Sequence, residues 1–551
     1  MSEYILIKGG EVIDGTGKPA VKADVLIKDD LIEEIGKIEK FNGASVIDAR
    51  NLVVAPGFID IHTHLDFFLP SPRHASVLES WVRMGVTTLV GGLCGFSPAP
   101  INHEHVEDLN IYWNFAIPKE GLNYEWTSFG QFLDYLDEIG QAFNVAMLTG
   151  HNTLRNNVMG FQARFANDDE INEMKRQLKQ SLDEGSFGLS VGLGYVPGIF
   201  SHTNEIMEVA SVLKDYNRPL VTHPRGLSNQ YHKAIEEVIF IAEKNRIPLQ
   251  ISHNSSVSLK AGPKAQKIIK AAIERGINIG YDNIPYASGC STAFCALPPL
   301  LLDGGIKKCY KRLLDPEIRR KVIDDIKNYR IKWPNWEHDY WTDKFLKETK
   351  LSKLLGVKTL MHGFKLEKNR RFENMNLRDI AKELGKNYID TFLDFILEER
   401  GGIFFTAVIA DGKFGDRFIA KAIKDPNCSI ITDHVGADFD TAHPVQYGAF
   451  TKVLGQFARD RGMMTMEEAI RKMTSLPASQ MQLDNRSTIK KGFFADITIF
   501  NPETVNCRAT FKNPRLPSEG IEYVIINGKI VLEKGNCNSE ALAGKALRKV
   551  K

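Results

Sequence analysis

Apolar and polar positions at the two ends of the chain alternate in short runs that predict β-strands. Near the end of the chain, two such runs flank Asn527-Gly528, a dipeptide that supplies the two positive φ angles of a type I′ hairpin turn. Neither end is long enough to bury a core alone. We therefore expect residues 1–55 and 490–551 to pair into one small β-sandwich domain.

Between these ends, β-prone runs alternate with segments of helical periodicity, which predicts βα units and a parallel sheet. Eight strands would make a closed (β/α)₈ TIM barrel, and we expect this α/β fold for residues 56–489. An open, doubly wound sheet is the alternative that the pattern leaves. The expected strands are residues 53–61, 86–91, 144–149, 188–191, 219–222, 248–252, 278–281 and 429–432.

The connection between the seventh and eighth strands is far longer than a barrel loop needs. It contains a charged, helix-like segment at residues 317–329 and an aromatic run at residues 333–336. We expect a helical insertion at about residues 297–375, lying over the barrel mouth or packed on its side.

The composition, 43% hydrophobic and 25% charged over 551 residues with a net charge of +2, is that of a globular protein with a large core. Basic residues are spread along the chain and offset by acidic ones, so we expect no nucleic-acid partner. No apolar run is long enough to span a membrane, and the first residues lack the basic and apolar pattern of a signal peptide, so we expect neither. Seven irregularly spaced cysteines indicate reduced thiols and a cytoplasmic protein.

Side chains that bind metals stand where a barrel gathers its chemistry, at the carboxyl ends of the strands. The first strand runs into His62-Thr63-His64, and residues two apart on a strand point to the same side. A single buried His or Cys is most often a packed core residue. Six such residues at strand ends predict a metal site instead: His62, His64, Cys94, His223, His253 and Asp433.

The ligand types suggest two positions for zinc, one tight and one weaker. Cys94, His223 and His253 would form a tight site that includes a thiolate, and His62, His64 and Asp433 a second, harder one. Many two-metal barrel hydrolases bridge their ions through a lysine that carbon dioxide modifies, at the end of strand four. Residues 187–195 contain no lysine, so Cys94 could take that bridging place.

Zinc lowers the pKa of a bound water and polarises a carbonyl oxygen. Asp433 could take the proton from that water and then hand it to a departing amine. These steps make up the hydrolysis of an amide bond in a small molecule.

Several motifs resemble a known family. Residues 13–17, 54–66 and 85–88 resemble the opening of the amidohydrolase superfamily; residues 94–100, 150–155, 194–195, 222–225, 251–253, 447–455 and 473–478 are similar to its N-acyl-D-amino-acid deacylase (D-aminoacylase) branch. The resemblance implies the same six zinc ligands, with Asp433 as general base and acid. It also implies that Tyr195 holds the substrate carbonyl and that His151 and Arg155 lie at the pocket wall.

The chain differs from this family at the positions where family members bind a substrate carboxylate. Family members carry Lys, Tyr and Arg at the positions that are Ser255, Ile284 and Val445 here. A buried carboxylate without a partner is costly. We therefore expect an amide that lacks the α-carboxylate, or a bulkier acylated or cyclic compound. The residues left for a different grip are Arg225, Tyr286, Ser288 and Ser291, and Cys290, Phe294 and Cys295 could line a more apolar pocket or pack at the barrel rim.

Two other functions compete with this interpretation. A cyclic-amide hydrolase of the hydantoinase or dihydroorotase kind is the nearer one, and the missing strand-four lysine counts against it. A non-catalytic scaffold relative is the other, but such relatives usually lose ligands, and none is lost here. The sequence leaves the oligomeric state open, including a homo-oligomer.

Overall fold

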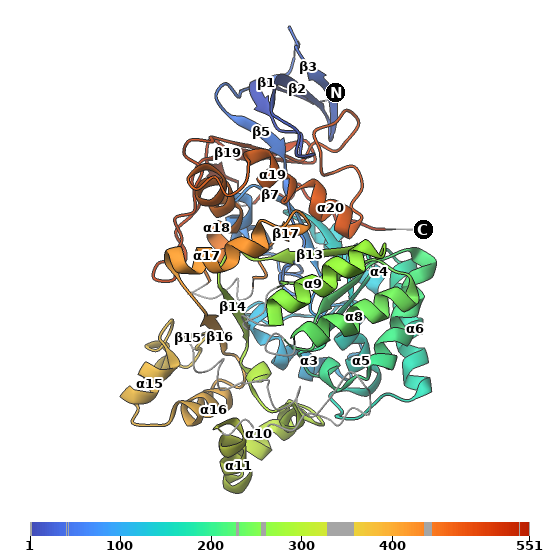
Figure 1. Ribbon diagram of the computed structural model, residues 1–551, viewed down its shortest axis with the longest axis vertical. Coiled ribbons are helices and arrows are strands. Elements are labelled where there is room, and N and C mark those ends of the chain that lie inside the picture. Colours follow the sequence, from blue (N-terminus) through green and yellow to red (C-terminus); the bar gives the residue numbers. More distant parts are fainter. Residues whose placement is uncertain are drawn as a thin grey trace.

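The computed structural model describes residues 3–39, 41, 43–226, 231–254, 261–327, 358–434, 443–538 and 540–549. Strands from both ends of the chain form one nine-stranded sheet, in which β5 (Val53–Pro56) pairs antiparallel with β18 (Ile497–Phe500) (Figure 1). The two ends therefore share one sheet, while the domain limits at residues 55 and 490 stay predictions. The other strands of this sheet are β1 (Tyr4–Val12), β2 (Val21–Lys28), β3 (Leu31–Gly36), β4 (Ser45–Asp48), β19 (Ile521–Ile526), β20 (Lys529–Glu533) and β21 (Asn536–Cys537).

The middle of the chain forms parallel sheets, which confirms the α/β class. One sheet has the order β6-β7-β8 and the other β17-β13-β12-β11-β10-β9, and β8 leads directly into β9. Every pairing within these two sheets is parallel. Their strands are β6 (Phe58–Asp60), β7 (Val86–Gly91), β8 (Asn144–Met147), β9 (Thr149–Gly150), β10 (Leu189–Gly192), β11 (Leu220–His223), β12 (Leu249–Ile251), β13 (Ile279–Asn283) and β17 (Cys428–Ile430).

The first and last parallel strands meet just beyond their carboxyl ends. Thr63 and His434 form an isolated parallel bridge, and the Asp433 N–H donates to the His62 carbonyl over 2.9 Å. This contact brings residues that follow β6 beside residues that follow β17.

The expected strand at residues 53–61 is two strands, because the chain changes sheets at Gly57. β5 belongs to the sheet of the two ends and β6 to a parallel sheet. A Cβ at Gly57 would lie 2.2 Å from Thr87 Oγ1, so only glycine fits at this crossing.

Helices follow the parallel strands, as the periodicity predicts. In α6 (Asp168–Asp183), Asn167 and Glu170 form a capping box, and Met174, Leu178 and Leu182 are buried four residues apart on one face. The remaining helices outside the insertion are α1 (His74–Val77), α2 (Glu79–Val82), α3 (Val106–Tyr112), α4 (Phe129–Ile139), α5 (His151–Met159), α7 (Thr203–Ala210), α8 (Tyr231–Asn245), α9 (Ala261–Glu274), α17 (Gly412–Ile423), α18 (Val445–Lys452), α19 (Met466–Arg471) and α20 (Ser475–Met481). None of the described helices is long and apolar enough to cross a membrane.

The insertion, which lies within the connection between β13 and β17 and precedes α17, is not purely helical, which corrects the expectation. It contains an antiparallel sheet of β14 (Ser288–Thr292), β16 (Phe404–Val408) and β15 (Lys358–His362), and it extends past residue 375. Its helices lie at the opposite end of the molecule from the strands of the two termini (Figure 1). The expected aromatic run at residues 333–336 lies outside the described residues. The described helices of the insertion are α10 (Ile306–Leu314), α11 (Pro316–Lys327), α14 (Glu367–Arg370), α15 (Leu377–Glu383) and α16 (Tyr388–Glu398).

Candidate metal centre

The six predicted ligands come together at the carboxyl ends of the parallel strands. They form three overlapping groups whose ligand atoms lie within 4.8 Å of one another: His62, His64 and Cys94; Cys94, His223 and His253; and His62, His253 and Asp433. All six side chains are buried except that of Asp433, which is 18% exposed. Asp433 is thus the ligand through which the centre reaches solvent.

The spacing around Cys94 fits a zinc ion. Its Sγ lies 3.5 Å from His62 Nε2, 3.6 Å from His223 Nδ1 and 3.8 Å from His253 Nε2. Zn–S and Zn–N bonds of about 2.3 and 2.0–2.1 Å at tetrahedral angles put sulfur and nitrogen about 3.6 Å apart. The donor set and its spacing therefore fit the metal that the sequence predicts.

His62 joins the two positions that the sequence separates. Its Nε2 lies 3.3 Å from Asp433 Oδ1 as well as 3.5 Å from Cys94 Sγ, and His64 Nε2 lies 3.4 Å from the same Asp433 oxygen. The tight and weak sites are thus neighbouring parts of one cluster.

Three of the candidate ligands have left-handed backbone conformations. The φ angles are +51° for Cys94, +34° for His253 and +46° for Asp433. Residues other than glycine rarely adopt such angles, and those that do gather at functional sites. The Cys94 turn packs closely against Gly192, where an added Cβ would lie 1.8 Å from the Cys94 carbonyl oxygen.

Burial and neighbouring groups set the charges of several of the candidate ligands. It lowers the pKa values of His62 and His223 well below the ordinary value, which keeps both imidazoles neutral and able to bind a metal. Burial raises the pKa of the Cys94 thiol, so a thiolate here needs a nearby cation. Burial alone would raise the pKa of Asp433, but a hydrogen bond from His64, whose Nε2 lies 3.4 Å from Asp433 Oδ1, favours the charged form, and the pKa lies below its usual value, so this carboxylate is anionic.

Three buried carboxylates behind the ligands escaped the sequence analysis. Burial raises the pKa values of Asp60 and Asp66 to about 6 and that of Asp282 to about 8. Asp60 accepts hydrogen bonds from Trp81 Nε1 and the Thr432 hydroxyl, and Asp66 accepts one from the Gly92 N–H. Asp282 is the penultimate residue of β13 and directly follows the expected strand at residues 278–281, so the search of strand ends that found the other ligands would have found it at strand seven.

Tyr195 and Ser291 lie together beside the cluster. The Tyr195 ring centroid is 4.5 Å from that of His223, and the Ser291 side chain lies near enough to influence the pKa of Tyr195. Burial raises the pKa of Tyr195 well above its usual value, so its hydroxyl stays protonated and can donate.

His151, Arg155 and Arg225 are buried and paired with carboxylates. His151 Nε2 and Arg155 Nε both lie 3.0 Å from Glu205 Oε1, and Arg225 lies 3.1 Å from Glu237. The charges of both arginines are therefore matched within the fold. Their contact with substrate stays a prediction.

Ser288 is the first residue of β14, the first strand of the insertion, and Tyr286 lies just before that strand. The Tyr286 hydroxyl lies 3.4 Å from Cys507 Sγ, and the Lys452 ammonium sits 3.9 Å from its ring centroid. Ser288 Oγ lies 2.7 Å from His443 Nε2, whose Nδ1 accepts the Val445 N–H. The Nε2 of His443 therefore carries the proton and donates to Ser288, which leaves the serine hydroxyl free to donate onward.

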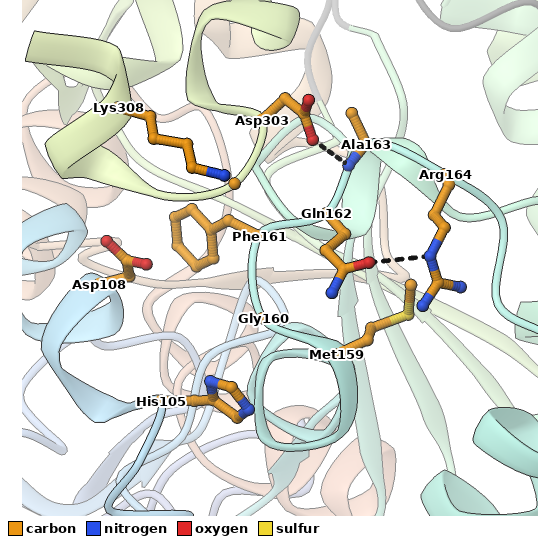
Figure 2. A pocket seen from close by; sticks show the side chains of 11 residues that line it. His105, Asp108, Met159, Gly160, Phe161, Gln162, Ala163, Arg164, Asp303 and Lys308 are labelled. Atoms are coloured by element: carbon orange, nitrogen blue, oxygen red, sulfur yellow. Dashed lines mark hydrogen bonds between the residues drawn. The ribbon is translucent and has the colours of Figure 1, made fainter. Parts of the chain in front are cut away.

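A surface cavity of about 520 Å³ lies elsewhere, between the loop that follows α5 and the start of the insertion (Figure 2). Its lining includes His105, Phe161, Arg164, Asp303 and Lys308, and none of the six candidate ligands. The donor set, not this hollow, therefore marks the candidate site.

Comparison with known proteins gives the family. The model of the amidohydrolase family matches residues 45–300 and 417–532. A D-aminoacylase of Alcaligenes xylosoxydans xylosoxydans is 29% identical over 96% of this chain and 94% of its own. The chain belongs to the amidohydrolase family and, within it, to the D-aminoacylase family.

Two solved structures are similar over 99% of both chains, each with a TM-score of 0.79. One is a D-aminoacylase, 28% identical, with a binuclear metal centre described as activated by one metal and attenuated by the second. The other is an N-acyl-D-glutamate deacylase from Bordetella bronchiseptica, 24% identical, in complex with zinc and a phosphonate inhibitor that mimics the tetrahedral intermediate. Since the two enzymes superpose equally well, the fold does not choose between their substrates.

Proposed function

We propose that this chain is a zinc-dependent hydrolase of the linear amide bond in a small N-acylated compound. The observation that carries the proposal is the set of distances from Cys94 Sγ to three imidazole nitrogens, 3.5, 3.6 and 3.8 Å. When bound there, zinc would activate a water molecule and polarise the amide carbonyl.

Asp433 moves the proton in this proposal. Its carboxylate is anionic and reaches solvent, so it can accept a proton from the attacking water and pass it to the departing amine nitrogen. The protonated Tyr195 hydroxyl, beside His223, donates a hydrogen bond to the carbonyl oxygen as negative charge develops on it.

Cys94 would hold metal together with both predicted groups of ligands. Its sulfur lies 3.5 Å from His62 of one predicted group and 3.6 Å from His223 of the other. The end of β10 offers no lysine to bridge two metal ions, which favours this arrangement over that of the cyclic-amide hydrolases. The bonds between the ends of β6 and β17 support closure of the parallel strands into one eight-stranded barrel around this centre.

The substrate in this proposal is an amide without an α-carboxylate. Three cations buried in this part of the fold are already matched: Arg155 by Glu205, Arg225 by Glu237 and Lys452 by Asp416. Val445 and Ile284, both buried, stand where the family's carboxylate grip is expected. Ser255, the third such position, lies outside the described residues.

The test is amine release by the zinc-loaded protein from N-acyl-D-amino acids, their L forms and matching amides without the carboxylate. We expect the carboxylate-free amides to react fastest, and Asp433→Asn to serve as the control for contaminating hydrolases. Faster release from the D-acids would support the reaction but refute the substrate. Release from none of them, with ring opening of cyclic amides, would refute the linear-amide assignment.

A further inference from the structure

A single buried carboxylate, that of Asp282, reaches two of the candidate ligands. Its Oδ1 accepts the His253 backbone N–H over 2.6 Å and lies 3.7 Å from His62 Nδ1. Its Oδ2 accepts a hydrogen bond from Gln250 Nε2 over 2.7 Å. Asp282 is only 1% exposed, so its contacts are with the protein rather than with solvent.

His62 needs an acceptor on the side that faces Asp282. Its Nε2 points to the cluster, 3.5 Å from Cys94 Sγ, so metal binding through Nε2 puts the ring proton on Nδ1. That Nδ1 is buried and has no hydrogen-bond partner. Ligand histidines usually donate this proton to a carboxylate or a carbonyl, and the Asp282 carboxylate stands on that side.

His253 needs support of a different kind, because its backbone is strained. Its φ of +34° is unfavourable for a residue with a side chain, and the conformation persists only where the surroundings fix it. The short bond from its N–H to Asp282 holds the turn that aims the imidazole at Cys94 and His223.

We propose that Asp282 is the positioning residue of the metal centre. It accepts the Nδ1 proton of His62 in the metal-loaded protein and holds the His253 turn through its N–H. It contacts neither the metal nor the substrate. This inference rests on the metal centre of the proposed function.

The test compares the zinc affinity of Asp282→Asn with that of Gln250→Met, in metal-free protein titrated against a competing chelator. Gln250→Met removes one buried hydrogen bond to Asp282 and neither ligand contact, so it is the matched control. We expect Asp282→Asn to weaken zinc binding about 10- to 100-fold, and Gln250→Met to change it little. Thermal unfolding of the metal-free variants shows whether each is folded.

The visible spectrum of cobalt-substituted protein gives a second readout, because it reports ligand geometry and not stability. We expect Asp282→Asn to alter this spectrum and Gln250→Met to leave it unchanged. Wild-type zinc affinity together with a wild-type cobalt spectrum in folded Asp282→Asn would overturn the proposal.

A crystal structure of the zinc-loaded wild-type protein decides the matter if Asp282→Asn does not fold. We expect His62 Nδ1 and Asp282 Oδ1 within about 3.2 Å; a different acceptor on Nδ1 would overturn the role of Asp282. A wild-type protein that binds no zinc would instead refute the metal centre itself, and the role of Asp282 with it.

Discussion

Gly194 stands behind the imidazole of His223, where a single methyl group would press on a candidate ligand. An added Cβ would lie 2.9 Å from His223 Nε2 and 3.2 Å from Cδ2. Unstrained contacts of this kind need about 3.5 Å, so Gly194→Ala should push the ring by about 0.6 Å. The opposite nitrogen, Nδ1, already lies 2.8 Å from His253 Nε2 and 3.6 Å from Cys94 Sγ, so the push is toward the cluster.

A displacement of this size exceeds the tolerance of about 0.5 Å within which a metal site must hold its ligands. We predict that Gly194→Ala weakens zinc binding about tenfold, or about 1.4 kcal/mol. Gly194 does not have a left-handed φ, so alanine adds no backbone strain of its own. Gly289 on β14 is the matched control, because an added Cβ there meets nothing within 4 Å.

The assay is zinc titration of metal-free protein against a competing chelator, with thermal unfolding to confirm that each variant is folded. Gly289→Ala should bind zinc as the wild type does, and Gly194→Val should bind it more weakly than Gly194→Ala. If Gly194→Ala keeps wild-type affinity, the reasoning that places His223 Nδ1 on the metal is refuted. An equal loss in Gly289→Ala would point to a general effect of replacing glycine.

Three further predictions concern other parts of the chain. Cys94→Ser should lose most of its bound zinc, while Cys290→Ser should keep it, because the Cys290 thiol lies 3.0 Å from the Thr406 hydroxyl and outside the cluster. Metal analysis after gel filtration measures the zinc in both variants, and zinc retained by Cys94→Ser would contradict a role for the Cys94 sulfur as ligand. Arg225→Met leaves the buried Glu237 without its cation and should lower the free energy of unfolding by about 3–5 kcal/mol. Denaturant unfolding should show that Arg225→Met/Glu237→Gln recovers most of this stability, and an unchanged free energy of unfolding in Arg225→Met would contradict the pairing. Burial lowers the pKa of His443 from its ordinary value of 6.5 to about 3, so between these pH values the unfolded chain binds a proton that the folded chain does not. The free energy of unfolding should therefore fall as the pH falls from 6.5 toward 3, and an equally steep fall in His443→Gln would contradict this prediction.

The ligand cluster could be predicted from the sequence because its residues stand at the ends of parallel strands. Parallel strands deliver their last residues to one edge, so His223 and His253 can be placed together from the strand pattern alone. Local turn chemistry likewise predicts the Asn527-Gly528 hairpin, where both φ angles are positive.

Other features depend on tertiary contacts that no local pattern contains. Nothing within residues 151–155 reveals that Glu205, some 50 residues away, engages both His151 and Arg155. The break at Gly57 likewise depends on Thr87, which comes from another strand. The strands of the insertion were missed because β16 pairs with β14 on one side and β15 on the other across long stretches of chain.

The cytoplasmic location stays a prediction, and the oligomeric state stays open. The roles of His151, Arg155, Arg225, Tyr286, Ser288 and Ser291 toward substrate also stay predictions. Each can be read from the same amine-release assay with single substitutions.

Zinc-dependent amine release by this chain tests the central claim most directly. The protein is stripped of metal, reloaded with measured amounts of zinc, and assayed on the amide that the substrate panel selects. We predict no release without metal, release that rises with zinc up to the first equivalent, and none above background in zinc-loaded Asp433→Asn. Equal release by metal-free and zinc-loaded protein would contradict the account.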